Sequence, residues 1–326
     1  MRSGAEFGEC VSGRERHRSI AGGRKIAHDR TSMDFSAELK RLVKEVEAGI
    51  ERLLPPATTR PARIHEAMRY SMTAGGKRLR PVLVLATAEI FGASTQRALP
   101  AAVAIECLHT YSLIHDDLPC MDNDDLRRGR PTAHRAFDEA TALLAGDALL
   151  THAFALLAEE YADDPTLAHS LSRVLADAAG SQRLIGGQMA DLLAEGKADV
   201  SAEELQFIHA QKTAAMIECA LEFGGIVGGA NAEDRQSLRE CGRHLGLAFQ
   251  ITDDILDATG DSAVLGKTAG KDAKAGKFTF PRVHGVEVSR QMSRAESDAA
   301  EAALGRVCRD NMFLSNMIRS LIDRSR

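Results

Sequence analysis

The sequence predicts an all-α fold, arranged as a single large helical bundle. Residues that favour helices dominate the chain, β-branched alternation is scarce, and nine prolines are too few to separate the strands of a large sheet. The 326 residues are 44% apolar and contain no internal repeat, so they can bury one large core. We therefore expect one helical domain rather than a mixed or all-β structure.

Residues 1–32 differ in composition from the rest of the chain. They contain seven Lys or Arg against four Asp or Glu, are rich in Gly, Ser and Arg, and show no apolar period. We expect this extension to be disordered, without the apolar core of a secretory signal and too acidic for a mitochondrial transit peptide. The first amphipathic helix is expected to begin at Met33, which we hypothesise to be the natural start. The folded domain is predicted to span 33–326.

A basic segment at 75–81 joins Gly75 and Gly76 to Lys77, Arg78 and Arg80. Paired glycines let backbone amides approach an anion, and the start of a helix attracts negative charge. The arrangement is typical of phosphate binding, although a solvated basic turn has the same composition. Other basic residues that could complete such a site follow later in the chain, namely Arg127, Arg128, Lys212, Lys267 and Lys277.

A long apolar run leads into the first aspartate cluster, Asp116, Asp117 and Asp122. On a straight helix Asp116 and Asp122 would lie about 240° apart, at about 100° per residue, so their carboxylates could not meet. Pro119 provides a bend, because it lacks an N–H group and its ring crowds the preceding turn. We therefore expect a kink or a helix end at 118–121.

The segment 143–157 is apolar on every side of a helix. Its leucines, alanines and phenylalanine recur too continuously to leave one solvent-exposed face. We expect this helix to lie at the centre of the bundle.

The second aspartate cluster, Asp253, Asp254 and Asp257, follows another apolar run in which only Gln250 is polar. On a helix, Asp253 and Asp257 share one face, with Asp254 on its flank. Carboxylates this close in apolar surroundings must bind protons or a hard divalent cation, and all-oxygen ligands favour magnesium, manganese or calcium over zinc. A solvated helix end is the alternative for a single cluster, but two clusters favour a metal site.

Composition argues against several classes of function. A net charge of −5, no Trp and only 4% aromatic residues disfavour nonspecific nucleic-acid binding. No apolar run of about 18 residues is free of charge, so no membrane span is expected. The six cysteines form no CxxC pair, which is typical of free thiols in a reducing compartment such as the cytoplasm.

Together these segments resemble the trans-isoprenyl diphosphate synthases, and most closely the bacterial farnesyl diphosphate synthases. The resemblance covers about residues 40–325 and rests on the segments 75–81, 112–129, 144–149, 212–213 and 249–257. It implies a helical bundle of the isoprenoid synthase type around a deep central cavity, with the aspartate clusters facing each other across its mouth. It also implies a homodimer.

The resemblance further implies a prenyltransferase that condenses isopentenyl diphosphate with an allylic diphosphate, either dimethylallyl or geranyl diphosphate. Three magnesium ions, for which manganese could substitute, would be held by Asp116, Asp117, Asp122, Asp253, Asp254 and Asp257. The allylic diphosphate would be bound by Arg127, Lys212 and Lys267, with Lys277 as a further substrate-binding residue, and isopentenyl diphosphate by Lys77, Arg80, His109 and Arg128. The catalytic set would be Lys212, Thr213 and Gln250, in which Thr213 and Gln250 face the reacting carbons.

Product length is predicted from Tyr111 and Ser112, which precede Asp116 by about one helical turn. Tyr111 would lie about 7.5 Å below Asp116 and form the floor of the cavity. A bulky floor at that depth favours farnesyl diphosphate, the C15 product. Ordinary core packing is the alternative role for this tyrosine.

Other functions stay open on the sequence alone. Plant-like geranylgeranyl diphosphate synthases share the segment 118–125 but usually carry a smaller residue in place of Tyr111, so a synthase of that C20 product is the first alternative. A terpene cyclase would share the fold but would leave the second aspartate cluster unexplained. A noncatalytic partner subunit would be expected to have lost metal ligands, whereas all six aspartates are present.

Overall fold

The computed structural model describes residues 23–195, 197, 199–260, 277–307 and 310–322. The chain divides into residues 1–38 and 39–326. The described part of 1–38 belongs to helix α1 (Gly23–Leu53), which begins at Gly23 rather than at Met33. Arg, Lys, Ile and Ala continue the helix upstream at little cost. A domain boundary at residue 33 stays a prediction, and the predicted disorder of 1–22 lies outside the described residues.

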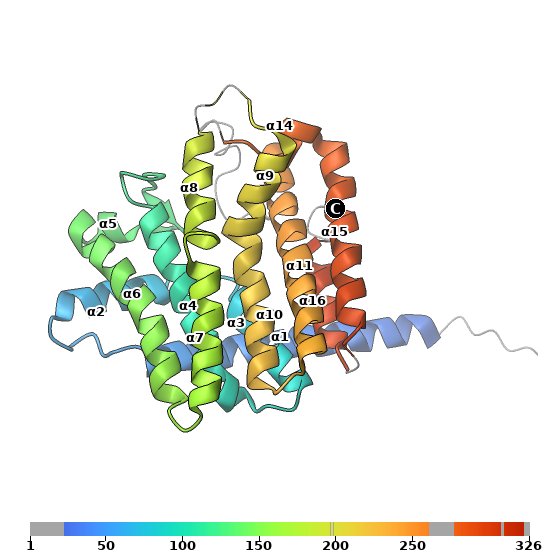
Figure 1. Ribbon diagram of the computed structural model, residues 1–326, viewed down its shortest axis with the longest axis horizontal. Helices are drawn as coiled ribbons and strands as arrows, with labels where there is room; N and C mark the ends of the chain where they lie inside the picture. The colour runs from blue at the N-terminus through green and yellow to red at the C-terminus, as the bar shows by residue number, and fades with distance from the viewer. Residues whose placement is uncertain (1–22, 196, 198, 261–276, 308–309, 323–326) are drawn as a thin grey trace, which may run out of the picture. The chain divides into compact units, whose positions relative to one another are not determined.

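The described residues of 39–326 are mostly helical, which confirms the all-α prediction (Figure 1). The helices after α1 are α2 (Ala62–Met72), α3 (Leu79–Ile90), α4 (Thr95–Asp116), α5 (Ala133–Ala136), α6 (Glu139–Glu160), α7 (Pro165–Ala179), α8 (Leu184–Ala194), α9 (Ala202–His209), the π-helical turn η1 (Ala210–Ala214), α10 (Ala215–Val227), α11 (Ala232–Thr259), α14 (Phe280–His284), α15 (Val286–Gly305) and α16 (Met312–Ile322). The described strands, β1 (Leu126–Arg127) and β2 (Arg130–Pro131), form one antiparallel hairpin.

Helices α3, α4, α10 and α11 form the centre of this bundle. Helix α4 packs on α3 and α6, while α10 packs on α3 and α11, and α15 covers the other side of α11. Side chains of α4 are buried without interruption from Ala98 to Leu108. This continuous burial explains why its sequence carries so few polar residues.

Local sequence explains where several helices begin. The side chains of Asp138, Asp164 and Asn231 accept hydrogen bonds from the first turns of α6, α7 and α11, respectively. Each such cap satisfies a backbone N–H group that has no partner inside its helix, and typically contributes about 1 kcal/mol. These caps fix the starts of three helices, of which α11 carries the second aspartate cluster and α6 contributes Leu143 to the cavity described below.

Helix α6 does not lie at the centre, so that prediction is wrong. Ala142, Ala145 and Leu149 are buried, but Leu143 and Leu144 are 46% and 53% exposed. Apolar residues surround the helix, yet the packed chain covers only one side. By length and composition α6 could cross a membrane, and 39% of the relevant window is buried. One such helix is weak evidence, because core helices of soluble proteins meet the same criteria.

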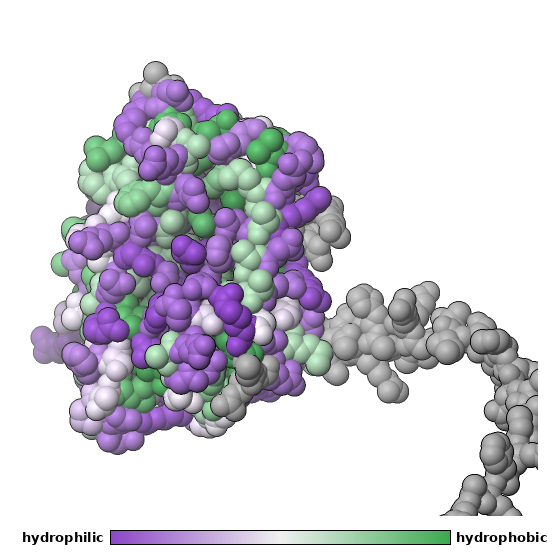
Figure 2. All heavy atoms as spheres, turned by 45° about the vertical axis from the view of Figure 1, so that its right-hand side comes forward, coloured by the Kyte–Doolittle hydropathy of each residue, from purple (hydrophilic) through white to green (hydrophobic). Residues whose placement is uncertain are grey.

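One face of the molecule mixes residue types. The face in Figure 2 shows hydrophilic side chains interspersed with hydrophobic ones, without one continuous apolar area. Isolated exposed apolar residues of this kind are ordinary on a protein surface.

Candidate active site

The first aspartate cluster lies where α4 ends. The helix stops at Asp116, slightly before the predicted 118–121, and Pro119 lies in the turn that follows. The backbone N–H of Asp122 donates to the carbonyl of Asp116 at 2.8 Å, which brings the chain back toward the helix end. Asn123 follows with a positive φ of 50°. The predicted helix end is therefore confirmed, and it returns Asp122 to the neighbourhood of Asp116.

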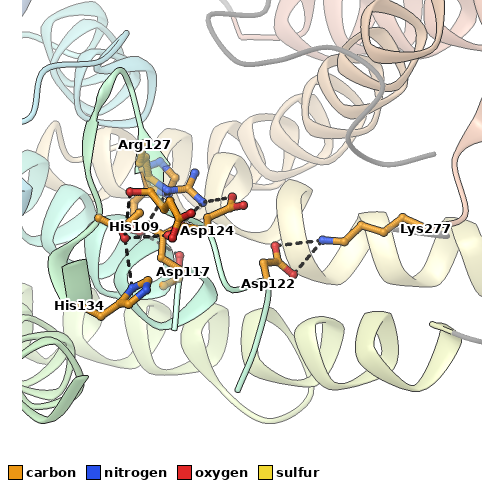
Figure 3. A network of polar contacts seen from close by, with 10 residues as sticks. His109, Asp117, Asp122, Asp124, Arg127, His134 and Lys277 are labelled. Carbon is orange, nitrogen blue, oxygen red and sulfur yellow. Dashed lines mark hydrogen bonds and ion pairs between the residues drawn. The ribbon is translucent and has the colours of Figure 1, made fainter. Parts of the chain in front are cut away.

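Two of these aspartates are already engaged by basic side chains (Figure 3). Arg127 donates to Asp117 at 2.6 and 2.9 Å, and Lys277 donates to both carboxylate oxygens of Asp122 at 3.0 Å. Asp117 is only 3% exposed. Its main observed contact is to Arg127, so Asp117 holds a basic residue in place at the mouth of the site.

Burial and neighbouring charges both act on Asp116. Burial raises the pKa of Asp116, Asp122 raises it further, and Lys212 acts in the opposite direction. A carboxylate in such a position is stabilised by any added cation.

A tight hairpin places the two arginines that follow the first cluster. Arg128 and Gly129, between β1 and β2, have φ values of 55° and 76°. Two consecutive positive φ values fit the two-residue turns that match the twist of a hairpin. The turn separates the side chains, so Arg127 reaches Asp117 while Arg128 donates to the carbonyl of Gly75. This hairpin was not predicted from the sequence.

The basic segment 75–81 is fixed from inside the protein. Arg78 is buried and donates to Glu47 at 2.6 Å and to Glu106 at 2.7 Å. A Cβ atom on Gly76 would lie 2.4 Å from Cζ of Arg128, so glycine is needed for the close approach of this guanidinium group. Arg78 therefore holds the segment rather than serving as a ligand, and Glu106 is a structural partner that the sequence analysis did not identify.

Arg80 and His109 form a polar wall of the site beside the basic segment 75–81. Arg80 Nη1 lies 3.3 Å from His109 Nε2, and both residues line the cavity described below. Burial, followed by the charge of Arg80, lowers the pKa of His109 well below its usual value, so the neutral ring accepts from Arg80. Lys77 is exposed at the adjacent position. Of the four predicted isopentenyl diphosphate ligands, the structure brings Arg80, His109 and Arg128 together.

Lys212 and Thr213 lie on a π-helical turn rather than on a regular helix. A Cβ atom on Gly187 would lie 2.5 Å from the backbone N of Lys212, and one on Gly246 would lie 2.3 Å from Cα of Ala214. The two glycines therefore make room for the widened backbone of η1. π-Helical turns of this kind occur frequently at functional sites.

Lys212 is oriented by Asp191 on α8, a residue outside the predicted site. Its Nζ donates to Asp191 Oδ2 at 2.7 Å. Burial raises the pKa of Asp191, but the ammonium group of Lys212 outweighs burial and lowers the pKa overall. The ion pair therefore fixes the position of the Lys212 side chain, which also lines the cavity described below.

The second aspartate cluster lies on α11, as predicted, with Asp254 on the flank. Asp254 accepts hydrogen bonds from Gln250 Nε2 at 2.8 Å and from the backbone N of Phe280 at 3.1 Å. Gln250 Oε1 in turn accepts from Thr213 at 2.8 Å. This chain of bonds fixes the amide of Gln250 and orients the hydroxyl of Thr213. Asp257 is 3% exposed.

A cavity of about 500 Å³ opens beside these groups. Arg80, Asp116, Lys212 and Thr213 form its polar end, and Gln250 is absent from the described residues that line it. Its apolar wall contains Tyr111, Leu184, Ile185, Met189, Leu192 and Met216. Tyr111 and Ser112 both line the cavity, as predicted, and Tyr111 is 5% exposed.

The donor set fits a hard divalent cation shared with a substrate. Among the described residues, no three acidic, His or Cys side chains lie close enough to bind an ion by themselves. Magnesium is usually bound through one or two carboxylates, with substrate phosphates and water completing the shell. Asp116 and Asp122 provide such a pair, and Asp253 lies within electrostatic reach of Arg80. Lys267 lies outside the described residues.

Comparison with known proteins identifies the family. The polyprenyl synthetase family matches residues 61–307. The chain belongs to this family. It is therefore a prenyl-transferring enzyme, and the predicted resemblance to the trans-isoprenyl diphosphate synthases is confirmed.

Individual relatives within the polyprenyl synthetase family support the same assignment. A chloroplastic geranylgeranyl pyrophosphate synthase of Catharanthus roseus is 47% identical over 277 residues, which cover 84% of this chain and 76% of the relative. Geranylgeranyl pyrophosphate synthase 7 of Arabidopsis thaliana is 51% identical over 248 residues, which cover 75% of this chain and 72% of the relative. An FPP/GFPP synthase of Zymomonas mobilis matches with 39% identity and a TM-score of 0.80, covering 89% of this chain and 99% of that one.

Proposed function

We propose that this polyprenyl synthetase is a magnesium-dependent geranylgeranyl diphosphate synthase, which adds isopentenyl diphosphate to an allylic diphosphate until the chain reaches C20. The main support is a cavity that is largely apolar and has Arg80, Asp116 and Lys212 at its polar end. A hydrocarbon chain suits the apolar part. A diphosphate suits basic side chains beside metal-binding carboxylates.

The residues at the mouth of the cavity are proposed to have separate roles in prenyl transfer. When the allylic C–O bond breaks, negative charge develops on the departing diphosphate, and Arg127 and Lys212 are the basic groups proposed to stabilise it. Magnesium held by the aspartates, including Asp116 and Asp122, would neutralise charge on the same diphosphate.

Thr213 is proposed to face the positive charge on the allylic carbons. It donates its proton to Gln250, so its oxygen lone pairs remain available to the cavity that it lines. The geometry supports Gln250 as the residue that orients Thr213, in place of the direct contact with carbon that the sequence suggested. The π-bond of isopentenyl diphosphate then forms the new C–C bond, and the departing diphosphate takes the proton that is lost.

Arg80, His109 and Arg128 are proposed to bind isopentenyl diphosphate. The Nε atom of Arg80 is buried and has no hydrogen-bond partner among the described residues. An unpaired buried donor of this kind is costly unless a ligand satisfies it. A diphosphate oxygen is the acceptor that the surrounding positive charge favours.

Two observations support the C20 product. The relatives with 47% and 51% identity are geranylgeranyl pyrophosphate synthases by description. In addition, α8 lines the cavity from Leu192 to Leu184, about 12 Å, whereas α4 lines it from Asp116 to His109, about 10.5 Å. The lining along α8 is therefore longer than the distance of about 7.5 Å that separates Asp116 from Tyr111 along α4.

Farnesyl diphosphate is the second candidate product. Tyr111 is a bulky, buried part of the cavity wall at the depth expected of a floor. The similar Zymomonas mobilis structure is described as an FPP/GFPP synthase. These observations favour a shorter chain.

The test is incubation of the purified protein with magnesium, labelled isopentenyl diphosphate and dimethylallyl diphosphate, followed by chain-length analysis of the dephosphorylated alcohols. Geranylgeraniol is expected, and farnesol would support the second candidate. No incorporation would contradict chain elongation and favour a terpene cyclase or a noncatalytic subunit. Tyr111→Ala, with Tyr111→Phe as the size-matched control, then tests whether this ring limits length.

We also propose that the chain acts as a homodimer in a reducing compartment such as the cytoplasm. Leu143 and Leu144 on α6, together with Ile185, Met189 and Leu193 on α8, are between 46% and 60% exposed. A second copy could cover them. Cys107, Cys120, Cys219 and Cys241 are unpaired. Light scattering should give twice the chain mass, whereas a monomer would favour a different partner, since one relative is the large subunit of a heterodimeric synthase.

A further inference from the structure

We propose that His115 and Gly146 form a contact that sets the position of Tyr111 and so controls the length of the chain that the cavity accepts. The inference rests on the prenyl-elongating function proposed above. It assigns product specificity to a pair of residues outside the metal and diphosphate sites.

His115 connects the wall of the cavity to α6. The ring lines the cavity, and its Nε2 lies 3.0 Å from the backbone carbonyl oxygen of Leu143. A carbonyl can only accept, so this nitrogen carries the proton and the ring is held against α6. Asp147 lies on the same side, with Oδ1 at 3.7 Å from Nε2.

The ring of Tyr111 packs against the ring of His115. The ring centroids are 5.6 Å apart and the ring planes meet at 89°, an edge-to-face contact between residues one helical turn apart on α4. Both rings line the cavity. His115 therefore supports Tyr111 from the side of α6, and a displaced His115 would carry the tyrosine with it.

Gly146 makes the position of His115 possible. A Cβ atom at residue 146 would lie 2.2 Å from Nε2 and 2.4 Å from Cδ2 of His115, well inside van der Waals contact. The ring therefore lies directly over the glycine. Any side chain at residue 146 must push the ring off α6, and the open direction is the cavity that His115 lines.

Three variants test this arrangement through the ratio of longer to shorter alcohols. Gly146→Ala should push His115 toward the cavity and lower the ratio by about fivefold, equivalent to about 1 kcal/mol. His115→Ala should remove the support of Tyr111, let its ring move toward α6, and raise the ratio. The double variant should match His115→Ala, because the new methyl group then meets no ring. Such strong non-additivity is expected only for residues in contact.

Gly224→Ala is the control for a tight helix contact away from the cavity. A Cβ atom there would lie 2.5 Å from Cβ of Thr87 and 2.6 Å from the backbone O of Val84, between α10 and α3, and neither residue belongs to the cavity wall. It should lower stability without changing the ratio. His115→Ala introduces no clash, so the test holds even if Gly146→Ala fails to fold. Normal isopentenyl incorporation with an unchanged ratio in His115→Ala would overturn the inference, whereas no incorporation by the unaltered protein would overturn the proposed function instead.

Discussion

The two aspartate clusters use the same side chain but are held by different kinds of structure. The first lies in a turn beyond the end of α4, where Asp117 pairs with Arg127 and Asp122 pairs with Lys277. The second lies inside α11, where Asp254 accepts hydrogen bonds from a side-chain amide and a backbone N–H. The contacts described for the first cluster are thus ion pairs, whereas the hydrogen bonds described for Asp254 come from neutral donors on or beside a regular helix.

This difference indicates how each cluster responds to a ligand. Ion pairs at a partly exposed mouth depend on screening and can be exchanged for the charges of metal and diphosphate. Neutral hydrogen bonds on a regular helix keep their geometry whether or not a ligand is present. We therefore expect the first cluster to rearrange on binding and the second to stay fixed.

The largest effect is expected when one carboxylate is removed from each cluster. Asp116→Asn and Asp253→Asn should each lower kcat by about 10²–10³-fold, because each loses negative charge where cations must gather. The measurement is the rate of isopentenyl incorporation over a range of magnesium concentrations. Asp163→Asn, which removes an exposed carboxylate paired with Arg97, is the control and should change little. A normal rate for Asp253→Asn would show that the second cluster is structural only.

A smaller effect, on stability, should distinguish the contribution of charge in the first cluster from that of hydrogen bonding in the second. Asp117→Asn leaves Arg127 with a neutral partner. In Asp254→Asn the new amide group points its own N–H at Gln250 or at the backbone N–H of Phe280, so one of the two hydrogen bonds is lost. Each should lower the free energy of unfolding by about 1–3 kcal/mol in urea titrations. Added sodium chloride should reduce the Asp117→Asn effect, since Arg127 is 32% exposed, but not the Asp254→Asn effect. Equal salt dependence would contradict the distinction between the clusters.

The second cluster was the easier of the two to predict. A regular helix repeats with a fixed period, so the spacing of Asp253, Asp254 and Asp257 alone determines which face of the helix each of them occupies. For the first cluster, Pro119 predicted that the helix ends. It could not predict that Asp122 meets Lys277, because those residues are separated by 155 positions and no local pattern relates them.

Other parts of the site depend on backbone geometry that leaves a weak sequence signal. The π-helical turn at Lys212 widens a helix without changing its composition, and its glycine neighbours lie on α8 and α11. The hairpin at Arg128 needs a positive φ at a residue that seldom adopts one. Gly129 beside it was the one available signal. The exposed side of α6 was also unpredictable, because hydrophobicity alone does not say which surface the chain itself covers.

The next test concerns Asp191, which supports the first cluster indirectly. Asp191→Asn should free Lys212 to pair with Asp116, whose pKa this lysine already affects. We expect kcat/KM for the allylic diphosphate to fall by about fivefold, equivalent to about 1 kcal/mol, with little change in the affinity for isopentenyl diphosphate. Asp298→Asn on the exposed side of α15 is the control. Equal losses for both substrates would mean that Asp191 stabilises the whole fold rather than the first cluster.

The smallest expected effect is the pH dependence of the same pair. The pKa of Asp191 is lowered in the folded protein, so its contribution to stability is fully present above the unfolded value of about 3.9 and is lost as pH falls through the lower folded value. The difference in unfolding free energy between the unaltered protein and Asp191→Asn should therefore stay constant from neutral pH to about pH 4 and narrow only below it. If this difference in unfolding free energy narrowed near neutral pH instead, burial and not Lys212 would determine the pKa of Asp191. The pair would then not support the first cluster through its charge.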